Sequence, residues 1–323
     1  MTAPRAPRSG RRRLLRVLFV VAASGCCVAA IVAERGPLGV AVSRLRLGSV
    51  LLATALACGG NLASMLCWRS LLAELGSLLP VRAAARVFFL GQLGKYLPGS
   101  VWPVIAQAEL GRDHHVPPRR SAAATVLTLV VGLVLGLAVA GATLPFAAPD
   151  AVRRYGWALA AAPLLALLLH PRVLQPVLAS VFRLARRPGL DGPPLRLAGI
   201  GRSALWALVT WICFGLQAAV LAAGLGGTGP AAAVAAVGAF ALAWSVGFLV
   251  VVVPAGAGVR EAVLVLALSP VLTAGAALLV ALVSRALLTS ADLILAGSAV
   301  LAERRRTGVR TAAVERAPVA PPR

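Results

Sequence analysis

Three observations predict an all-α fold, a polytopic integral membrane helical bundle with broken or re-entrant helices. Hydrophobic residues make up 59% of the 323-residue chain and charged residues only 13%, whereas about 25% of a soluble domain is charged. Apolar runs recur at a length close to the roughly 20 residues that cross a hydrocarbon core. Two of the apolar stretches are interrupted by Pro, Gly and charged side chains. This composition excludes an ordinary water-soluble protein.

The apolar runs, taken in order, set the expected spans and the limits of the domain. A membrane domain is expected at 14–301, between disordered basic arms at 1–13 and 302–323. Both arms are rich in Arg, which favours the cytoplasmic side and requires an even number of crossings. A short helix at 259–269, only about 16 Å long, would add one crossing to the long spans, so about seven or eight spans are expected. The long spans are expected at about 14–33, 47–67, 121–146, 155–170, 203–223, 232–253 and 271–301.

The net charge of +22 points to lipid head groups and not to nucleic acid. The arginines stand between apolar runs and at the two ends of the chain, where they retain loops in the cytoplasm and contact anionic lipids. We expect a multi-pass protein of the bacterial cytoplasmic (plasma) membrane, with both termini in the cytoplasm and no nucleic-acid partner. The basic, Pro-containing segment 171–202 is expected to be its longest polar connection.

Cysteine and histidine patterns predict neither a metal site nor a cofactor. The five cysteines fall inside apolar runs without zinc-ligand spacing, so they are expected to be packing residues. His114 and His115 lie in a basic stretch that is typical of a solvated loop. No HExxH, Walker A or G-x-S-x-G motif occurs. No catalytic residue is therefore assigned, and enzymatic activity is not the favoured hypothesis.

The sequence GQLGKYLPGSVWP, residues 91–103, is the first unusual interruption. It contains Lys95, the only lysine in the chain, beside Pro and Gly residues that break helices. Basic segments on both sides favour the same side of the membrane. Residues 87–110 are therefore expected to enter and return as a re-entrant element broken at Pro98 and Gly99, in a place where protein or water satisfies the open backbone.

A second interruption, VPAGAGVRE at residues 253–261, divides a broken helix at 247–269. Corresponding interruptions in the two halves of a transporter point to its binding site. Lys95 and Arg260, beside the N-terminal N–H groups of the short helices, would hold a lipid phosphate. The alternative is a pair of interfacial turns whose charges face water. The residues expected to form the helix breaks are Gly94, Pro98, Gly99, Pro254, Gly256 and Gly258.

Further ionised side chains lie in or near the apolar segments, where they are costly unless they face a cavity or a partner. Arg285 and Asp292 are seven residues apart, on one helix face but about 10.5 Å apart along the axis, which is too far for a direct pair. We expect an ion pair between Glu261 and Arg285, and the alternative is a set of structural ion pairs that lock the bundle. The expected substrate-binding residues are Lys95, Tyr96, Ser100, Trp102, Glu109, Arg260, Glu261, Arg285 and Asp292.

The two interruptions carry a resemblance to a known family. GQLGKYLPGSVW, followed by a helix containing Glu109, and the later VPAGAGVREAVLV resemble the lysylphosphatidylglycerol synthase transmembrane family over roughly residues 14–300. The resemblance implies a helical bundle with re-entrant elements. In the two-part members of the family this region is implicated in flipping an aminoacylated phospholipid, and the resemblance does not carry that substrate over to this chain. It also implies a stand-alone membrane domain, without the cytosolic aminoacyltransferase domain of the two-part members. The residues matched to the family's motifs are Gly94, Lys95, Pro98, Gly99, Trp102, Pro254, Gly256, Gly258, Arg260 and Glu261.

Three functional hypotheses remain open at the level of the sequence. The favoured one is a flippase-like protein that handles a phospholipid or lipid-linked head group such as aminoacyl-phosphatidylglycerol, with anionic lipids or polyprenyl phosphate as its ligands. The second is an integral membrane lipid-linked transferase, for which Glu109, Glu261 and Asp292 are the available carboxylates. The third is a membrane partner subunit of a separate synthase or glycosyltransferase. A homo-oligomer or a partner enzyme is compatible with each.

Overall fold

The computed structural model confirms the all-α fold. It describes residues 45–97, 101–147, 164–165, 167–184, 194–249 and 258–315, together with residues 18 and 21. Within these ranges there is no strand, and nine α-helices follow one another along the chain. Their bounds are Leu47–Glu74 (α3), Val81–Gln92 (α4), Trp102–Gly111 (α5), Pro118–Thr143 (α6), Pro171–Leu184 (α9), Leu197–Gly224 (α10), Gly229–Leu249 (α11), Val259–Leu268 (α12) and Ala274–Glu315 (α13).

Five of the described helices are long and apolar enough to cross a membrane. They are α3, α6 with the turn that follows it, α10, α11 and the first part of α13. These helices cover the predicted spans at 47–67, 121–146 and 203–223 and most of those at 232–253 and 271–301. Helix α13 begins at Ala274, three residues later than predicted, and residues 250–253 lie outside the described residues. The predicted arm at 1–13 and most of the predicted spans at 14–33 and 155–170 lie outside the described residues.

Two segments are more helical than the sequence analysis anticipated. Residues 171–184, part of the predicted polar connection, form α9, whose Leu174 and Leu178 are buried while Val173 and Val177 are more exposed. Apolar residues at these spacings give a helix one face to bury. The last helix also continues past residue 301 to Glu315, through a segment rich in Ala, Glu and Arg, which are strong helix formers.

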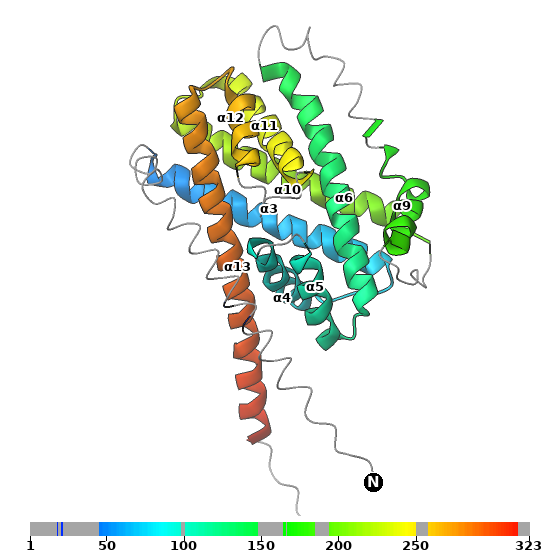
Figure 1. Ribbon diagram of the computed structural model, residues 1–323. Helices are drawn as coiled ribbons and strands as arrows, with labels where there is room; N and C mark the ends of the chain where they lie inside the picture. Colours follow the sequence, from blue (N-terminus) through cyan, green and yellow to red (C-terminus); the bar gives the residue numbers. More distant parts are fainter. Residues whose placement is uncertain are drawn as a thin grey trace, which may run out of the picture.

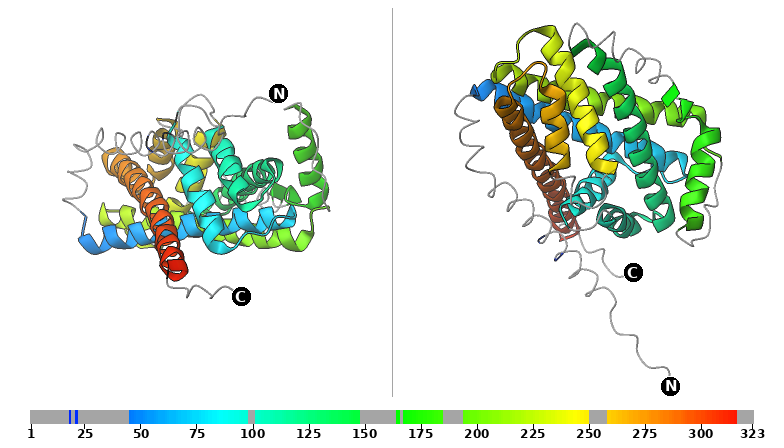
Figure 2. Two further views of the ribbon diagram at one scale, coloured as in Figure 1. Left: turned by 90° about the horizontal axis from the view of Figure 1, so that it is seen from below. Right: turned by 45° about the horizontal axis from the view of Figure 1, so that its top comes forward.

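Helices α3 and α10 form the centre of the structure as an antiparallel pair. Leu45, just before α3, lies against Gly224 at the end of α10, while Glu74 at the end of α3 lies against Gly199 near the start of α10. Figure 2 shows the two helices side by side along their length. Glycine at these points lets the two backbones approach closely, as is common where helices pack in a membrane.

Eight of the nine described helices, all except α9, fall into two units with the same order of elements. The first unit is α3–α6 and the second is α10–α13, and each consists of a long helix, a pair interrupted by a break and another long helix. Corresponding pairs pack in both units: α4 on α5 as α11 on α12, and α5 on α6 as α12 on α13. Each closing helix also packs on the other unit, α6 on α11 and α13 on α4. With α3 and α10 antiparallel, this is the arrangement of an inverted repeat.

Each interrupted pair is a helical hairpin, and the two hairpins approach α13 from opposite directions. In the second hairpin Gly247 lies against Arg260, and Gly227 lies against Leu272, so the chain runs out along α11 and returns along α12. The open end of this hairpin, where α11 begins and α12 ends, adjoins the start of α13. Helix α4 of the first hairpin packs farther along α13 (Figure 1). The described residues beside the two breaks, Lys95 and Tyr96 in one hairpin and Glu261 in the other, therefore all contact the membrane-spanning part of α13.

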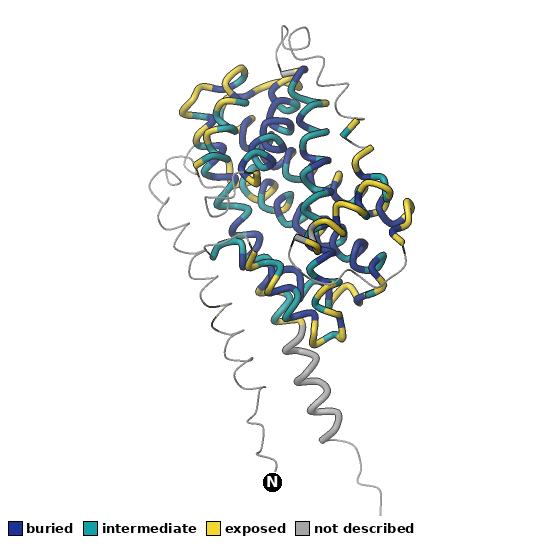
Figure 3. Tube along the Cα trace, turned by 45° about the vertical axis from the view of Figure 1, so that its right-hand side comes forward, coloured by how far each residue is buried: buried dark blue, intermediate teal, exposed yellow. Residues whose placement is uncertain are grey.

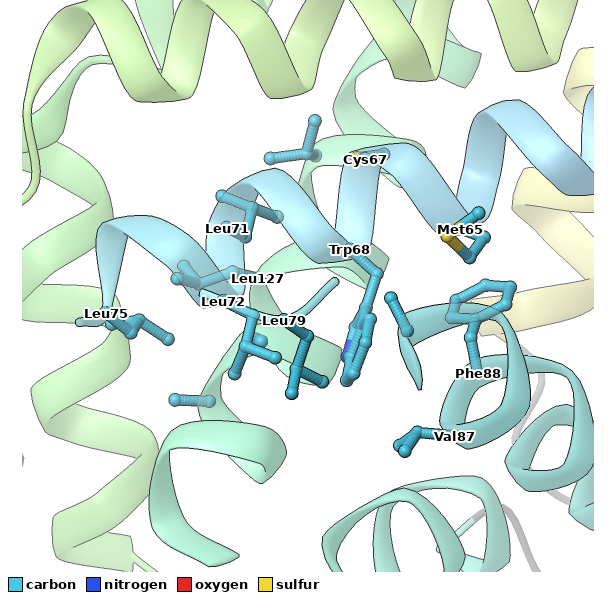
Figure 4. Packing of buried hydrophobic residues seen from close by; sticks show 14 of the residues in the cluster. Met65, Cys67, Trp68, Leu71, Leu72, Leu75, Leu79, Val87, Phe88 and Leu127 are labelled. Atoms are coloured by element: carbon cyan, nitrogen blue, oxygen red, sulfur yellow. The ribbon is translucent and has the colours of Figure 1, made fainter. Parts of the chain in front are cut away.

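The first hairpin is anchored by the hydrophobic core around Trp68 of α3 (Figure 4). The Trp68 ring lies 5.9 Å from the Phe88 ring of α4, and its indole N–H donates to Thr125 Oγ1 of α6 at 3.3 Å. Thr125 Oγ1 also hydrogen-bonds Gln107 Oε1 of α5 at 2.5 Å. Figure 3 shows that the buried residues line the inner surfaces of the bundle. Ring packing and the buried hydroxyl thus fix both halves of this hairpin.

A substitution of Gly91 tests the close contact between α4 and α5 in the first hairpin. A Cβ at Gly91 would collide with the Gln107 side chain and press on its backbone. We expect Gly91→Leu to lower the free energy of unfolding by about 1–3 kcal/mol, the usual cost of overpacking. Gly201→Leu in α10 is the control, because a Cβ there meets nothing within 4 Å. Thermal unfolding of the detergent-solubilised protein measures both, and equal melting temperatures would contradict the described packing.

Candidate functional site

Asp292 of α13 is the centre of the first group of polar contacts. Its side chain is only 3% exposed, and Lys95 Nζ lies 2.6 Å from its Oδ2. The Tyr96 hydroxyl donates to the same oxygen at 2.5 Å, and the Asn61 amide of α3 donates to Oδ1 at 3.2 Å. The carboxylate therefore holds α3 and the end of the first hairpin helix to α13.

The local backbone explains why Lys95 and Tyr96 reach α13 together. Helix α4 ends at Gln92 and tightens into a 3-10 turn, Leu93–Tyr96, before Leu97 becomes extended. Leu93 and Gly94 are buried in this turn. Because the turn tightens the helix end, the next two side chains, Lys95 and Tyr96, both bind Asp292.

The second group of contacts joins the other hairpin to α13 and contains the predicted ion pair. Arg285 Nη1 lies 2.7 Å from Glu261 Oε1, and both side chains are largely buried. Glu261 Oε2 also accepts the backbone N–H of Gly258 at 2.6 Å, which caps the start of α12. Gly258 has φ of 84°, a conformation that favours glycine over other residues. The Glu261 carboxylate thus both caps the start of α12 and binds Arg285 of α13.

Arg260 lies between the two groups without a carboxylate of its own. Its guanidinium carbon is 4.7 Å from the centre of the Phe240 ring of α11. Among the described residues no hydrogen bond or ion pair of this guanidinium is found, although it lies within electrostatic range of Glu261, Arg285 and Asp292. Its cation–π contact orients the charge but does not neutralise it.

The charges of the cluster do not cancel. We call these residues the α13 cluster: Lys95, Tyr96, Arg260, Glu261, Arg285 and Asp292, with Asn61 and Phe240 in contact with them. Three cations face two carboxylates, so one positive charge is in excess. An uncompensated cation in an apolar segment is costly. The cluster is therefore suited chemically to an anion with several oxygen acceptors.

The structure brings together six of the nine residues that the sequence singled out for substrate binding, namely those in the α13 cluster. Trp102 begins α5 and is 38% exposed. Glu109 is on the last turn of α5, about 10 Å along the helix from Trp102, and pairs with Arg112 at 3.2 Å. Of the six predicted hinge residues, Gly94 lies in the 3-10 turn after α4 and Gly258 immediately precedes α12. Ser100, Pro98, Gly99, Pro254 and Gly256 lie outside the described residues.

Sequence reasoning missed two residues of the cluster. Asn61 lies inside an apolar span, and its amide is a signal that could have been noticed, because polar side chains in spans seek partners. Phe240 gives no such signal, since it is one of many apolar residues in α11. In the described part of the chain, no three His, Cys, Asp or Glu side chains gather as potential metal ligands.

The comparisons with known proteins agree with the architecture. A family model described as the lysylphosphatidylglycerol synthase TM region matches residues 13–296. This match covers both hairpins and every residue of the α13 cluster. Comparison with curated proteins returned no significant match.

Asp292→Asn tests the first group of contacts. The substitution leaves Lys95 near an uncharged amide, and we expect unfolding to become easier by about 2–4 kcal/mol. This is somewhat less than the roughly 3–5 kcal/mol of a fully buried pair, because Lys95 is 35% exposed. Arg202→Gln is the control: Arg202 is 57% exposed and lies 3.6 Å from Glu74, so its loss should cost about 0–1 kcal/mol. A shift in melting temperature no larger than the control's would show that Asp292 does not hold the hairpin.

Two substitutions of Glu261 separate its two roles, the cap at the start of α12 and the ion pair with Arg285. A Gln side chain can still accept a hydrogen bond from the Gly258 N–H. A Leu side chain can accept a hydrogen bond neither from that N–H nor from Arg285. We expect both variants to melt below the wild type, with Glu261→Leu lower than Glu261→Gln by about 1 kcal/mol, the usual contribution of an N-terminal cap. Differential scanning calorimetry compares them. If the two variants melt together, the cap contributes nothing.

Proposed function

The chain belongs to the lysylphosphatidylglycerol synthase TM region family, and on that premise we propose that it moves a phospholipid or lipid-linked head group across the membrane as a flippase. Membership and the apolar helices make it a multi-pass membrane protein related to lipid handling. Its proposed location is the bacterial cytoplasmic membrane, with both termini in the cytoplasm, as the positive-inside rule favours. The proposed ligands are anionic or aminoacylated phospholipids, with polyprenyl phosphate as a further candidate.

The observation that carries this proposal is the uncompensated positive charge of the α13 cluster. Arg260 lies over Phe240 while the neighbouring carboxylates bind other groups. The phosphate of a lipid is an anion that the membrane itself supplies, and Arg binds phosphate through paired N–H groups. The cluster also lies beside the two helix breaks, which is the usual position of a transporter's binding site.

The hairpins suggest how a head group would pass. The first hairpin is joined to α13 by a cation, Lys95, on Asp292, and the second by an anion, Glu261, on Arg285. A lipid phosphate would compete with Asp292 for Lys95 and with Glu261 for Arg285. Because the hairpins approach α13 from opposite directions, release of each would open the cluster toward a different side. An ammonium on the head group would be received by the carboxylates that the phosphate displaces.

The transferase hypothesis is less well supported by the same contacts. Glu261 and Asp292 each bind a cation at 2.7 Å or less, and Glu109 pairs with Arg112, so each of the three carboxylates is engaged by a neighbouring side chain. A general base must be able to reach the proton it removes. In transport or lipid binding, a lipid phosphate would exchange with the carboxylates of these ion pairs. We therefore favour transport or lipid binding over transferase activity.

Reconstitution tests the proposal. Purified protein in liposomes would be assayed with labelled phosphatidylglycerol, lysyl-phosphatidylglycerol and polyprenyl phosphate in separate experiments. We expect protein-dependent movement of at least one lipid between leaflets. Arg260→Ala should slow it about tenfold or more, since a hydrogen bond to a charged group contributes roughly 1.5–3 kcal/mol. Arg202→Ala, an exposed arginine at the other end of α10 from the second hairpin, should keep the wild-type rate.

Two results would contradict the proposal. One is the absence of protein-dependent movement for all three lipids in vesicles that contain folded protein. The other is movement that Arg260→Ala and Arg202→Ala reduce equally, because the α13 cluster would then have no special part in it.

A further inference from the structure

Phe240 lies beneath the only cation of the α13 cluster that has no carboxylate partner among the described residues. The ring is 1% exposed, and the Arg260 guanidinium carbon lies 4.7 Å from its centre. The backbone of Arg260 is held separately from its guanidinium, because Gly247 of α11 lies against the Arg260 backbone and Cβ. The arginine is therefore fixed at both its backbone and its charged end.

The ring itself is held from behind by the centre of the fold. Phe240 packs on Phe214 of α10, with ring centres 5.8 Å apart. Phe214 in turn fills the space beside Gly60 of α3, where no side chain would fit. A chain of contacts thus runs from the α3–α10 pair to the guanidinium. Such a buried ring has little freedom to turn or to withdraw.

A guanidinium above an aromatic face is restricted in a useful way. The ring face attracts the planar cation, which leaves the N–H groups at its edge to bind oxygen. Two of those N–H groups match two oxygens of a phosphate in a bidentate pair. A lysine at this position would keep the charge but lose the fork-shaped geometry.

The neighbouring carboxylates do not take up these N–H groups in the described contacts. Glu261 binds Arg285 and the Gly258 N–H, and Asp292 binds Lys95, Tyr96 and Asn61. In the part of the chain that the structure describes, the N–H groups at the edge of the Arg260 guanidinium are the cationic groups of the cluster for which no acceptor is found.

We infer that Phe240 is a positioning residue, which holds the plane of Arg260 so that its edge binds two oxygens of a lipid phosphate diester. The inference rests on the proposed function in taking its ligand from a lipid. It goes further by assigning a role to an apolar residue of α11 and a geometry to the recognition of phosphate. Its test measures binding and does not require transport.

The test is a double-mutant cycle on affinity. Binding of dihexanoyl phosphatidylglycerol to the purified full-length protein in detergent would be measured by calorimetry for the wild type, Phe240→Leu, Arg260→Lys and the double variant. We expect Phe240→Leu to weaken binding about tenfold, as the loss of a desolvated cation–π contact does. Arg260→Lys should weaken it at least as much. The double variant should bind no more weakly than Arg260→Lys, because Phe240 acts through the guanidinium.

Two further variants separate positioning from packing. Phe240→Tyr keeps an aromatic face beneath Arg260 and should keep the affinity within about twofold of the wild type. Phe248→Leu is the matched control on the same helix: Phe248 is 38% exposed and stacks on Trp244 at 5.4 Å. It should leave the affinity unchanged. The melting temperature of each variant shows that the compared proteins are folded.

Several results would overturn the inference. These are wild-type affinity in Phe240→Leu, losses that simply add in the double variant, or a Phe240→Tyr variant as weak as Phe240→Leu. Failure of the wild type to bind the short-chain lipid would overturn it as well. If the affinities follow the expected pattern but no lipid moves between leaflets, the positioning role stands and the proposed flippase function fails.

Discussion

The structure depends on the need to pair two charges of α13 inside an apolar bundle. Arg285 and Asp292 share one face of this helix and lie about 10.5 Å apart along it, too far to pair with each other. An unpaired charge at this depth is costly, so each takes its partner from a different hairpin, Glu261 from one and Lys95 from the other. Both hairpins are therefore held against a single helix by its two charges.

The two ion pairs have opposite polarity, and this has consequences for function. The first hairpin presents the cation and the second presents the anion, while Arg260 adds a positive charge between them that Phe240 orients. In the proposed transport, a head group with a phosphate would exchange places with either carboxylate. Since the units α3–α6 and α10–α13 are arranged as an inverted repeat, the same exchange on the two sides would expose the cluster in opposite directions.

Much of the fold follows from local sequence, whereas most of the site does not. Hydropathy located the described spans, because about 20 apolar residues are what a hydrocarbon core requires. Pro and Gly located the breaks, and the high cost of a lone charge predicted Glu261 with Arg285. Tyr96 and Asp292 are 196 residues apart, and their contact depends on how the two units pack, which periodicity cannot reveal. Phe240 could not be distinguished from core residues, because its inferred role depends on the Arg260 guanidinium that the fold places over its ring.

The most direct test of the account is a charge swap across the contact between the first hairpin and α13. Thermal unfolding would be compared for Lys95→Asp, Asp292→Lys and the variant that carries both. If the hairpin docks on α13 through this pair, each single variant places like charges together and melts well below the wild type, and the double variant recovers most of the loss. A double variant as unstable as the sum of the two single changes would show that the two residues do not meet, and the shared cluster would not exist.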